Sequence, residues 1–518
     1  MDLLSSPSGT ATRRLEWRPT ALQLTVGLVG LAFAVRMIDL GVRPLWLDEA
    51  YSAWFSSRSW HELWTQVPTY EPHPPFYYSL LKVWRMLFGG SAVALRSFSL
   101  LLALATVPLV TAASGEFERL RPTGNPLLSA AIAGFLAATS PMLVMLGQEA
   151  RPYPLLVFAY ALAILGVLRL IREFAHGPGT WGSWLLLASG TELGLWAHGL
   201  GMIYAACLAA AFAPLWLKGM DRARFQRGVV ICALVMLLYL PCLLMVLNRA
   251  SDWSGNGWLT WSPVMALQLL SLYAVPVEVL TIGTAVAALV MLLLAKRALQ
   301  FCLERRGWTA DHAVLLLWWG PPLITILISQ FAFPVFLVRT LTPTIIPAAR
   351  AIGRSLAGSD SVRERFALAA ALMITLLPGS FAAAMRPATE PWDEVATYLN
   401  HNVHSGDEVW IYPNDSALPL SQAHASVPMR GIPGNYPAVG FSGPIRAGSP
   451  AVVSVTGREA ARLASQLSTE NVRTLWLVTR QSALFDPKSD VPAALDRIRL
   501  AGKTQKWGYI EVTPYYRR

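Results

Sequence analysis

The segment Arg43-Pro-Leu-Trp-Leu-Asp48-Glu49-Ala-Tyr51 sets two adjacent carboxylates just after the first apolar run of the chain. An unpaired carboxylate near a bilayer is costly, so Asp48 and Glu49 at this place indicate a function. They are candidate catalytic carboxylates of a membrane enzyme. The structural alternative is that one of them caps a helix that begins near Ala50, because Asp is a favoured N-cap residue and helix N-termini favour negative charge.

A second polar cluster is Glu71-Pro-His73-Pro-Pro-Phe-Tyr77-Tyr78. Its three prolines fix the backbone and present Glu71 and His73 at a defined place ahead of the next helix. Such side chains could orient a sugar or, together with Asp48, bind a divalent cation. Since these ligands show no diagnostic spacing, we assign no metal and no required cofactor, and a divalent-cation site at Asp48, Glu71 and His73 stays an alternative.

A third cluster, Gln148-Glu149-Ala-Arg151-Pro-Tyr153, closes an apolar run on the side of the membrane that we expect for Asp48, and Arg339 lies at the mouth of a later run. Guanidinium groups pair well with phosphate oxygens, so two converging arginines would suit an anionic phospholipid-type donor. The alternatives are that Glu149 pairs with Arg151 or that the arginines extend to lipid headgroups. His198 is a candidate for the site or a satisfied histidine at a helix end.

The composition predicts a polytopic membrane protein with a polar appendage. Of 518 residues, 54% are hydrophobic and 14% are charged, whereas a soluble protein needs more charge. The net charge of +11 could suggest nucleic acid, but lysines and arginines stand in short clusters between apolar runs, which is typical of membrane topology. We therefore expect a lipid bilayer, and no nucleic acid, among the partners.

Apolar runs of about 20 residues predict about eleven transmembrane helices. They cover residues 20–38, 92–113, 126–146, 154–171, 182–198, 200–217, 228–247, 275–295, 312–331, 337–352 and 366–385. With the N-terminus inside, every inner loop is basic, so the positive-inside rule places the C-terminal part outside the cytoplasm. The first run lacks a cleavage signature, and we expect it to be a retained anchor.

The first outer loop, residues 39–91, repeats aromatic and aliphatic residues at helical spacing in three short stretches, near 51–55, 60–67 and 76–87. This pattern predicts three amphipathic helices in the membrane interface, with polar faces turned toward a cavity. A simple interfacial anchor is the alternative.

Residues 386–518 have the composition of a soluble domain, and residues 1–385 form the membrane domain. Helices are predicted at 392–400, 458–466 and 493–500, and strands at 408–412, 451–455, 472–479 and 507–512. Alternating helices and strands indicate one small α/β domain. Residues 427–449 are predicted to be an irregular insertion, and the domain has no nucleotide-binding motif.

Taken together, these motifs resemble those of bacterial lipid-linked-sugar glycosyltransferases of the GT-C superfamily, in the branch with protein O-mannosyltransferases and the aminoarabinose transferases of lipid A. The resemblance covers most of the chain. It rests on Leu-Asp48-Glu49-Ala, His73-Pro-Pro-Phe-Tyr-Tyr, Leu95-Arg96-Ser97, Gln148-Glu149-Ala-Arg151-Pro-Tyr153, Arg339 with its prolines, Pro391-Trp-Asp-Glu-Val and Gly406-Asp407-Glu-Val.

The resemblance implies inverting transfer of a sugar from a polyprenyl-phosphate donor to an acceptor hydroxyl of a lipid, glycan or protein. It implies an inner-membrane enzyme with its site at the outer surface. Asp48 would be the general base or orient the acceptor, Glu49 would support it, and Arg151 and Arg339 would neutralise the departing phosphate. The expected substrate-binding positions are Glu71, His73, Tyr77, Lys82, Arg96, Gln148, Glu149, Arg151, Tyr153, His198 and Arg339.

One motif departs from this branch. Where the aminoarabinose transferases have Glu-Lys-Pro-Pro, this chain has Pro72-His73-Pro74-Pro75, so a lysine contact is missing and Lys82 is a candidate substitute. The donor and acceptor of that branch therefore do not carry over. Two functions of other classes stay open: a lipid flippase, for which Glu192 inside a span would be a path residue, and a non-catalytic subunit of an envelope complex.

Overall fold

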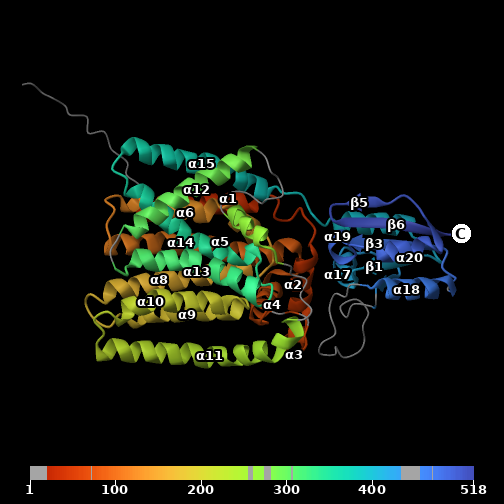
Figure 1. Cartoon of the computed structure of the whole chain (residues 1–518), viewed down its shortest axis with the longest axis horizontal. Helices are drawn as coiled ribbons and strands as arrows, with labels where there is room; N and C mark the ends of the chain where they lie inside the picture. Colours follow the sequence, from red (N-terminus) through yellow and green to blue (C-terminus); the bar gives the residue numbers. More distant parts are fainter. Residues whose placement is uncertain are drawn as a thin grey trace, which may run out of the picture.

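The computed structural model describes residues 20–69, 71, 73–254, 261–272, 282–304, 307–432, 434, 455–469 and 471–518. A large helical body comes first in the chain, and a smaller sheet domain follows it (Figure 1). The chain is thus a polytopic helical membrane protein with a small C-terminal α/β domain, as the composition predicts.

The apolar runs of the sequence coincide with helices, except that the first residues of the run at 275–295 lie outside the described part. Outside the loop at residues 39–91, the described elements of the body are α1 (Ala21–Met37), α5 (Ala92–Leu120), α6 (Pro126–Thr139), α7 (Pro141–Gly147), α8 (Tyr153–Glu173), α9 (Trp181–Ala197), α10 (Gly201–Leu217), α11 (Arg222–Ser254), η2 (Pro263–Leu272), α12 (Ile282–Leu303), α13 (Ala310–Phe331), η3 (Val338–Thr344), α14 (Ile345–Ala357) and α15 (Val362–Ala384).

Six helices among the described residues are long and apolar enough to cross a membrane, and a seventh span results if α6 and α7 count as one. The bend of 52° between α6 and α7 falls at Pro141, which has no N–H to continue the hydrogen-bond ladder. Helices α1 and α10 are apolar but shorter. The expected number of about eleven spans therefore stays a prediction.

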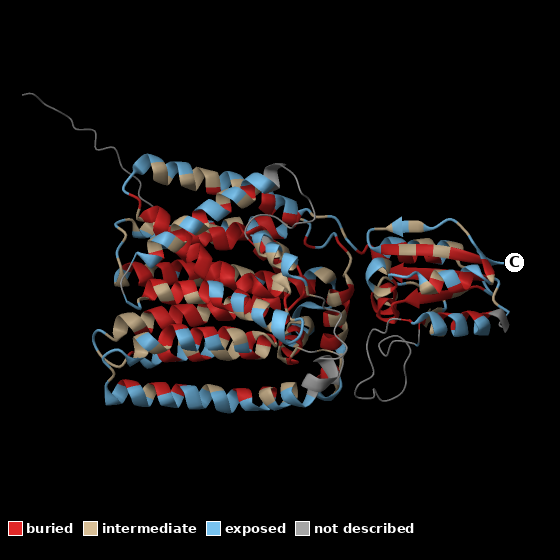
Figure 2. Ribbon diagram, in the orientation of Figure 1, coloured by how far each residue is buried: buried red, intermediate tan, exposed pale blue. Residues whose placement is uncertain are grey.

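Helix α8 lies at the centre of the body and α11 at its margin, as the burial colours in Figure 2 show. Close packing of α8 on α9 depends on glycine: a Cβ at Gly190 would lie 2.4 Å from the backbone nitrogen of Ala163, and one at Gly166 would lie 2.5 Å from that of Leu187. This packing matters for the site, because Arg151 lies two residues before the start of α8 and His198 directly follows α9.

The loop at residues 39–91 forms α2 (Leu47–Ser57), α3 (Trp60–Thr65), η1 (Val67–Thr69) and α4 (Phe76–Phe88), which confirms the three short helices. Their apolar residues do not all face lipid. Phe55 and Tyr78 are buried with ring centroids 4.9 Å apart, whereas Trp60 and Trp64 are exposed. The loop is therefore packed into the protein core on one side and open on the other.

The C-terminal domain contains a six-stranded mixed sheet in the order β2-β1-β3-β6-β4, with β5 paired to β6. Strands β1, β2 and β3 are parallel, and β6 is antiparallel to β3. Its elements are α16 (Trp392–Asn402), β1 (Glu408–Tyr412), η4 (Asn414–Ser416), α17 (Ala417–Gln422), β2 (Met429–Gly431), α18 (Gly457–Thr469), β3 (Thr474–Arg480), α19 (Ser482–Phe485), α20 (Asp490–Asp496), β4 (Arg499–Ala501), β5 (Gln505–Trp507) and β6 (Ile510–Arg517).

Several predicted elements of this domain need correction. The helix expected at 493–500 is wrong in its second half, because α20 ends at Asp496 and β4 begins at Arg499. The strand expected at 507–512 is divided between β5 and β6, since a turn at Gly508 separates them. The insertion expected at 427–449 includes β2, and its residues 433 and 435–449, like residues 451–454 of an expected strand, lie outside the described residues.

Strands β1 and β3 are adjacent and parallel, so their carboxyl ends lie at the same edge of the sheet. After β1 the chain forms β2 on one side of β1, and the following strand, β3, pairs with β1 on its other side. Polar groups at such a switch point are well placed to meet ligands. Helix α17 follows β1 and lies at the end of the domain nearest the helical body (Figure 1), where the Gln422 side-chain nitrogen donates to the Ala50 oxygen of α2 at 3.1 Å.

Candidate active site

Asp48 lies in the first turn of α2, and its carboxylate meets two arginines from distant parts of the chain. Oδ2 of Asp48 lies 3.1 Å from Nη2 of Arg339 and 3.6 Å from Nη2 of Arg151. Arg151 also donates from Nη1 to the main-chain oxygen of Asp48 at 3.0 Å. The three charged residues proposed as the centre of the site therefore converge.

The arginines keep Asp48 ionised. Burial opposes ionisation, but the guanidinium groups of Arg151, Arg339 and Arg480 hold the pKa of the Asp48 carboxyl below its ordinary value. The Asp48 side chain is still 21% exposed. The Asp48 carboxylate is therefore accessible from outside the protein, although it already contacts two guanidinium groups.

The start of α2 differs from the capping alternative. The helix begins at Leu47, before either acid, and Trp46 holds the N-cap position without a side-chain hydrogen bond. The alternative that one of the two acids is the N-cap of a helix starting near Ala50 is therefore wrong, although both acids lie in the first turn of α2. A carboxylate of the inter-domain segment takes that role, because Oε2 of Glu390 accepts a hydrogen bond from the Leu47 nitrogen at 3.0 Å.

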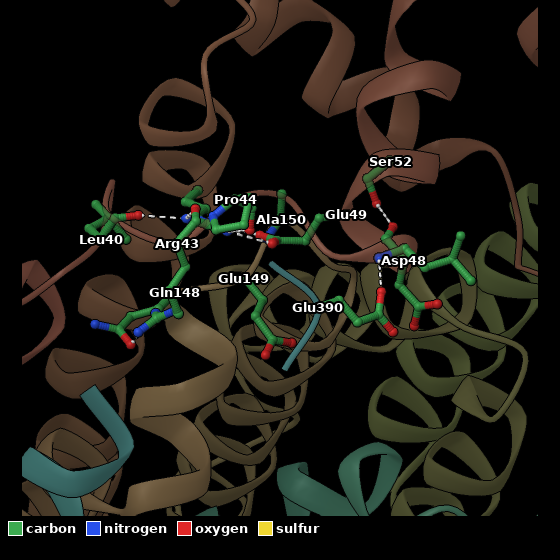
Figure 3. A network of polar contacts seen from close by, with 12 residues as sticks. Leu40, Arg43, Pro44, Asp48, Glu49, Ser52, Gln148, Glu149, Ala150 and Glu390 are labelled. Carbon is green, nitrogen blue, oxygen red and sulfur yellow. Dashed lines mark hydrogen bonds and ion pairs between the residues drawn. The ribbon is translucent and has the colours of Figure 1, made fainter. Parts of the chain in front are cut away.

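Glu49 points away from Asp48, as Figure 3 shows, and its carboxylate is fully engaged. It accepts two hydrogen bonds from Arg96, at 2.8 Å and 2.6 Å, and one from the Ala150 nitrogen at 2.9 Å. Arg96 in turn donates to the main-chain oxygens of Leu40, Arg43 and Pro44. This buried network ties α2 to α5 and to the turn before α8, so Glu49 and Arg96 hold the loop that carries Asp48.

Gln148 and Glu149 belong to a neighbouring network. Oε1 of Gln148 accepts from Arg43 and Arg386, each at 3.0 Å. Glu149 pairs with Arg386 at 2.9 Å, so the alternative in which Glu149 pairs with Arg151 is wrong. Both residues link the turn before α8 to the segment that leads into the sheet domain.

A group of imidazoles and a carboxyl lies beside the arginines. The Nε2 atom of His73 lies 3.6 Å from Oε1 of Glu71, and the rings of His73 and His198 are 4.0 Å apart between centroids. Tyr153 is 5.8 Å from His198 by the same measure. His198 lies beside His73 and Tyr153, but its Nδ1 also accepts a hydrogen bond from the Leu200 nitrogen at 3.1 Å, as in the alternative of a satisfied histidine at a helix end.

Both histidines are neutral at pH 7. Burial, and then the neighbouring His198, Arg151 and Arg339, hold the pKa of His73 well below its ordinary value. Burial and the same arginines lower the pKa of His198 to about 3. Burial also raises the pKa of Glu71 to about 7. The positive charge facing Asp48 therefore comes from the arginines, not from imidazolium groups.

Aromatic rings fix the two guanidinium groups. The guanidinium of Arg339 lies 5.5 Å from the ring centroid of Trp46 and 5.6 Å from that of Tyr153, and that of Arg151 lies 5.9 Å from Tyr153. Such contacts orient a planar cation. Tyr77 is buried, with its ring centroid 6.1 Å from that of Phe98, so its contacts are those of a packed core residue.

The overall architecture matches that of solved membrane glycosyltransferases. ArnT from Cupriavidus metallidurans aligns with a TM-score of 0.61 and 13% identity over 95% of this chain and 98% of that chain in the apo state, and with 0.59 and 14% over 96% and 98% when bound to undecaprenyl phosphate. The oligosaccharyltransferase of Archaeoglobus fulgidus aligns with 0.59 and 15% over 93% and 73%. The chain has the GT-C fold. No family model and no curated protein matches the sequence.

Within this GT-C fold, Lys82 does not lie with the charged centre. Its Nζ donates to the main-chain oxygen of Arg58 and lies 5.5 Å from the ring centroid of Trp60. The residue is on α4 and is engaged with the start of α3. The proposal that Lys82 replaces the missing lysine contact is therefore not supported by its geometry.

The charged centre at Asp48 does not fit a divalent cation. Among the residues that the structure describes, no group of three His, Cys, Asp or Glu side chains is arranged to hold a metal ion. Asp48, which such an ion would need, already faces Arg151 and Arg339. A dication bound to Asp48 would be repelled by both guanidinium groups.

Sequence reasoning missed the part of the site that comes from the sheet domain. Oε1 of Glu390 accepts from Nε of Arg480 at 2.6 Å, and Asp415 Oδ2 lies 3.5 Å from the Tyr51 hydroxyl on α2. Arg480 ends β3 and Asp415 follows β1, so both belong to the carboxyl edge of the sheet. The strand pattern could have indicated this edge, but nothing in the sequence indicated that it docks on α2.

Proposed function

We propose that this protein is a glycosyltransferase that moves a sugar from a polyprenyl-phosphate donor to an acceptor hydroxyl at the outer face of the cytoplasmic membrane. The observation that carries the proposal is the contact of one carboxylate, Asp48, with two arginines, Arg151 and Arg339. Its fold neighbours support the donor class: ArnT was solved with undecaprenyl phosphate and the Archaeoglobus enzyme with a dolichol-phosphate. The basic inner loops support the outer location.

The proposed reaction is a direct displacement. The acceptor oxygen attacks the anomeric carbon, the bond from that carbon to the phosphate oxygen breaks, and the lipid phosphate leaves with the bonding electrons. Asp48 takes the proton of the acceptor hydroxyl, and the configuration at the anomeric carbon inverts. Arg151 and Arg339 stabilise the charge that develops on the phosphate.

The arginines link donor binding to base strength. Without a donor they pair with Asp48 and hold its pKa low, which makes it a weak base. A phosphate bound between Arg151 and Arg339 competes for the same N–H groups, and its own negative charge disfavours the Asp48 carboxylate. Both effects raise the pKa of Asp48. The base is therefore strengthened when the donor is in place.

A flippase is less well supported. Glu192, the expected path residue, accepts a hydrogen bond from Trp196 at 2.8 Å one turn along the same helix, α9. The charged centre instead comes from three short segments: Asp48 from the first turn of α2, Arg151 from the turn before α8 and Arg339 from the start of η3.

The test uses the purified full chain in proteoliposomes with radiolabelled undecaprenyl-phosphate sugars and an extract of envelope glycolipids and glycans. We expect a labelled product with release of undecaprenyl phosphate in equal amount. The variant with Arg151→Ala and Arg339→Ala should lose this transfer, whereas Arg58→Ala, which removes another guanidinium from a tryptophan face of the same loop, should keep it. Movement of intact donor across the bilayer without a new glycosidic bond would instead favour the flippase.

A further inference from the structure

The carboxyl edge of the sheet domain carries buried oxygens without hydrogen-bond partners. Among the described residues, Asn414 Oδ1, Asp415 Oδ1 and Gln422 Oε1 are buried and accept no hydrogen bond. The Asp415 residue is only 2% exposed. A buried polar atom left unpaired costs free energy, so several such atoms on one short segment indicate a place prepared for a ligand.

This segment is fixed directly over the helix that carries Asp48. Gln422 donates from its side-chain nitrogen to the Ala50 oxygen at 3.1 Å, and the Tyr51 hydroxyl lies 3.5 Å from Asp415 Oδ2. Ala50 and Tyr51 follow Asp48 within one helical turn. The unpaired oxygens of the sheet domain and the proposed base therefore belong to one site.

Electrostatics also connect the two acids. Burial, and then the neighbouring Glu390 and Asp48, raise the pKa of the Asp415 carboxyl to about 6 against the opposing effect of Arg480. Asp48 is thus close enough to influence Asp415 across the domain boundary. The Asp48 carboxylate forms ion pairs with two arginines, whereas Oδ1 of Asp415 accepts no hydrogen bond from the described part of the chain.

The two walls of the site have opposite hydrogen-bonding character. On the membrane side, buried Nε groups of Arg151 and Arg339 have no partner in the described chain and can only donate. On the sheet side, the unpaired atoms are the acceptor oxygens of Asn414, Asp415 and Gln422 and the Ser416 hydroxyl, which can accept or donate. An anion suits the first wall and is disfavoured at the second, where a group that donates hydrogen bonds is favoured.

We propose that the edge formed by residues 414–422 is the acceptor subsite and that it binds a polyhydroxylated acceptor, such as a neutral glycan, through hydroxyl groups donated to Asp415 and its neighbours. The proposal rests on the function proposed above and deepens it by assigning the acceptor to the sheet domain. An acceptor whose reacting end carries a phosphate or carboxylate is disfavoured there.

Two variants of the full chain in nanodiscs test this subsite, with Asp393→Asn as matched control because Asp393 is an exposed acid of the same domain on α16. For Asp415→Ala we expect the KM for the acceptor to rise about tenfold, because one hydrogen bond to a carboxylate is lost. The affinity for undecaprenyl phosphate should stay within about twofold of the wild type. Asp415→Asn keeps an acceptor oxygen at the same place and should recover part of the loss.

Binding is measured separately from turnover, by saturation-transfer NMR with maltotriose as neutral probe and trigalacturonate as anionic probe. We expect a maltotriose signal that Asp415→Ala reduces and Asp393→Asn does not, and a weaker signal for trigalacturonate. No maltotriose signal, equal signals in all variants, or a parallel loss of undecaprenyl phosphate affinity would overturn the subsite. If no donor is turned over by the wild type, the proposed function fails, and the NMR result still decides the subsite.

Discussion

At the scale of single residues, the site depends on how two guanidinium groups are shared. Arg339 and Arg151 contact Asp48 in this structure, and the proposed reaction uses the same two groups to bind the donor phosphate. The Arg339 guanidinium lies against the rings of Trp46 and Tyr153. It can therefore exchange the Asp48 carboxylate for a phosphate while its plane stays stacked on these rings.

Arg339→Lys should weaken undecaprenyl phosphate binding about tenfold, because an ammonium keeps the charge but loses the planar fork and the stacking on Trp46. Native mass spectrometry of the protein with increasing undecaprenyl phosphate measures the change. Arg58→Lys is the control, since Arg58 lies 5.3 Å from the Trp54 ring centroid away from Asp48. Equal affinities for Arg339→Lys and the wild type would show that charge alone matters.

The raised pKa of the Asp415 carboxyl predicts that the stability of the folded protein depends on pH. Its folded-state pKa of about 6 lies above the ordinary value of 3.8, so the fold favours the neutral form and stability falls as pH rises between these values. The shift of about two pKa units corresponds to about 3 kcal/mol. Asp415→Asn should therefore raise the apparent melting temperature at pH 7.5 and do so much less at pH 4.5. A gain that is the same at both pH values would contradict the buried, destabilised carboxylate.

The sequence located Asp48, Arg151 and Arg339 because their place at the ends of apolar runs, counted from a basic inner side, puts them at one membrane surface. It could not locate Glu390, Asp415 and Arg480. The hydrogen bond from Leu47 to Glu390 joins residues 343 positions apart, and no local pattern encodes how two domains dock. The prediction that Lys82 replaces the missing lysine contact is not supported for a different reason. Lys82 is near His73 in sequence, but on α4 its side chain donates to the main-chain oxygen of Arg58.

At the scale of elements, α2 is the part that the rest of the molecule positions. Its first N–H group is capped from the segment before α16 by Glu390, its Glu49 is held by α5, and its Ala50 oxygen is bound by α17. Aromatic spacing predicted that the helices of this loop exist. The partners that orient α2 became visible only in the tertiary structure.

Glu390→Gln should destabilise the protein by about 3 kcal/mol, because it leaves the Arg480 guanidinium buried without its carboxylate. Thermal unfolding of the full chain measures this, and a cycle with Arg480→Met should show that the two changes are not additive. Glu511→Gln is the control, since its pair with Lys506 in the same sheet is 31% exposed at Glu511 and 66% at Lys506 and should contribute under about 1 kcal/mol. Additive effects would exclude a coupled pair at the start of α2.

At the scale of the whole molecule, a helical membrane body presents α2 to the edge of a sheet domain, and the proposed donor and acceptor walls come from different domains. The α/β class of the second domain followed from alternating helical and strand patterns. The misplaced boundary at 493–500 arose because Leu500 continues the apolar pattern while β4 pairs with β6, a contact that a local pattern does not contain.

This arrangement predicts sidedness. In a background with Cys232→Ser, a cysteine introduced by Lys506→Cys in the sheet domain should react with a membrane-impermeant maleimide added outside spheroplasts. One introduced by Arg222→Cys at the start of α11 should react only after permeabilisation. The reverse result would place the sheet domain in the cytoplasm and the site on the wrong side for the proposed donor.

The most direct test is the Asp48→Asn variant, measured for sugar transfer and for undecaprenyl phosphate affinity in the same preparation. Asp39→Asn is the control, because Asp39 is an exposed acid of the same loop. Its φ of 52° is a conformation that Asn tolerates. Loss of the carboxylate that competes for Arg151 and Arg339 should tighten phosphate binding several-fold. Loss of the base should lower transfer by about 100-fold or more. Unchanged transfer, or phosphate binding that weakens together with transfer, would contradict the role given to Asp48.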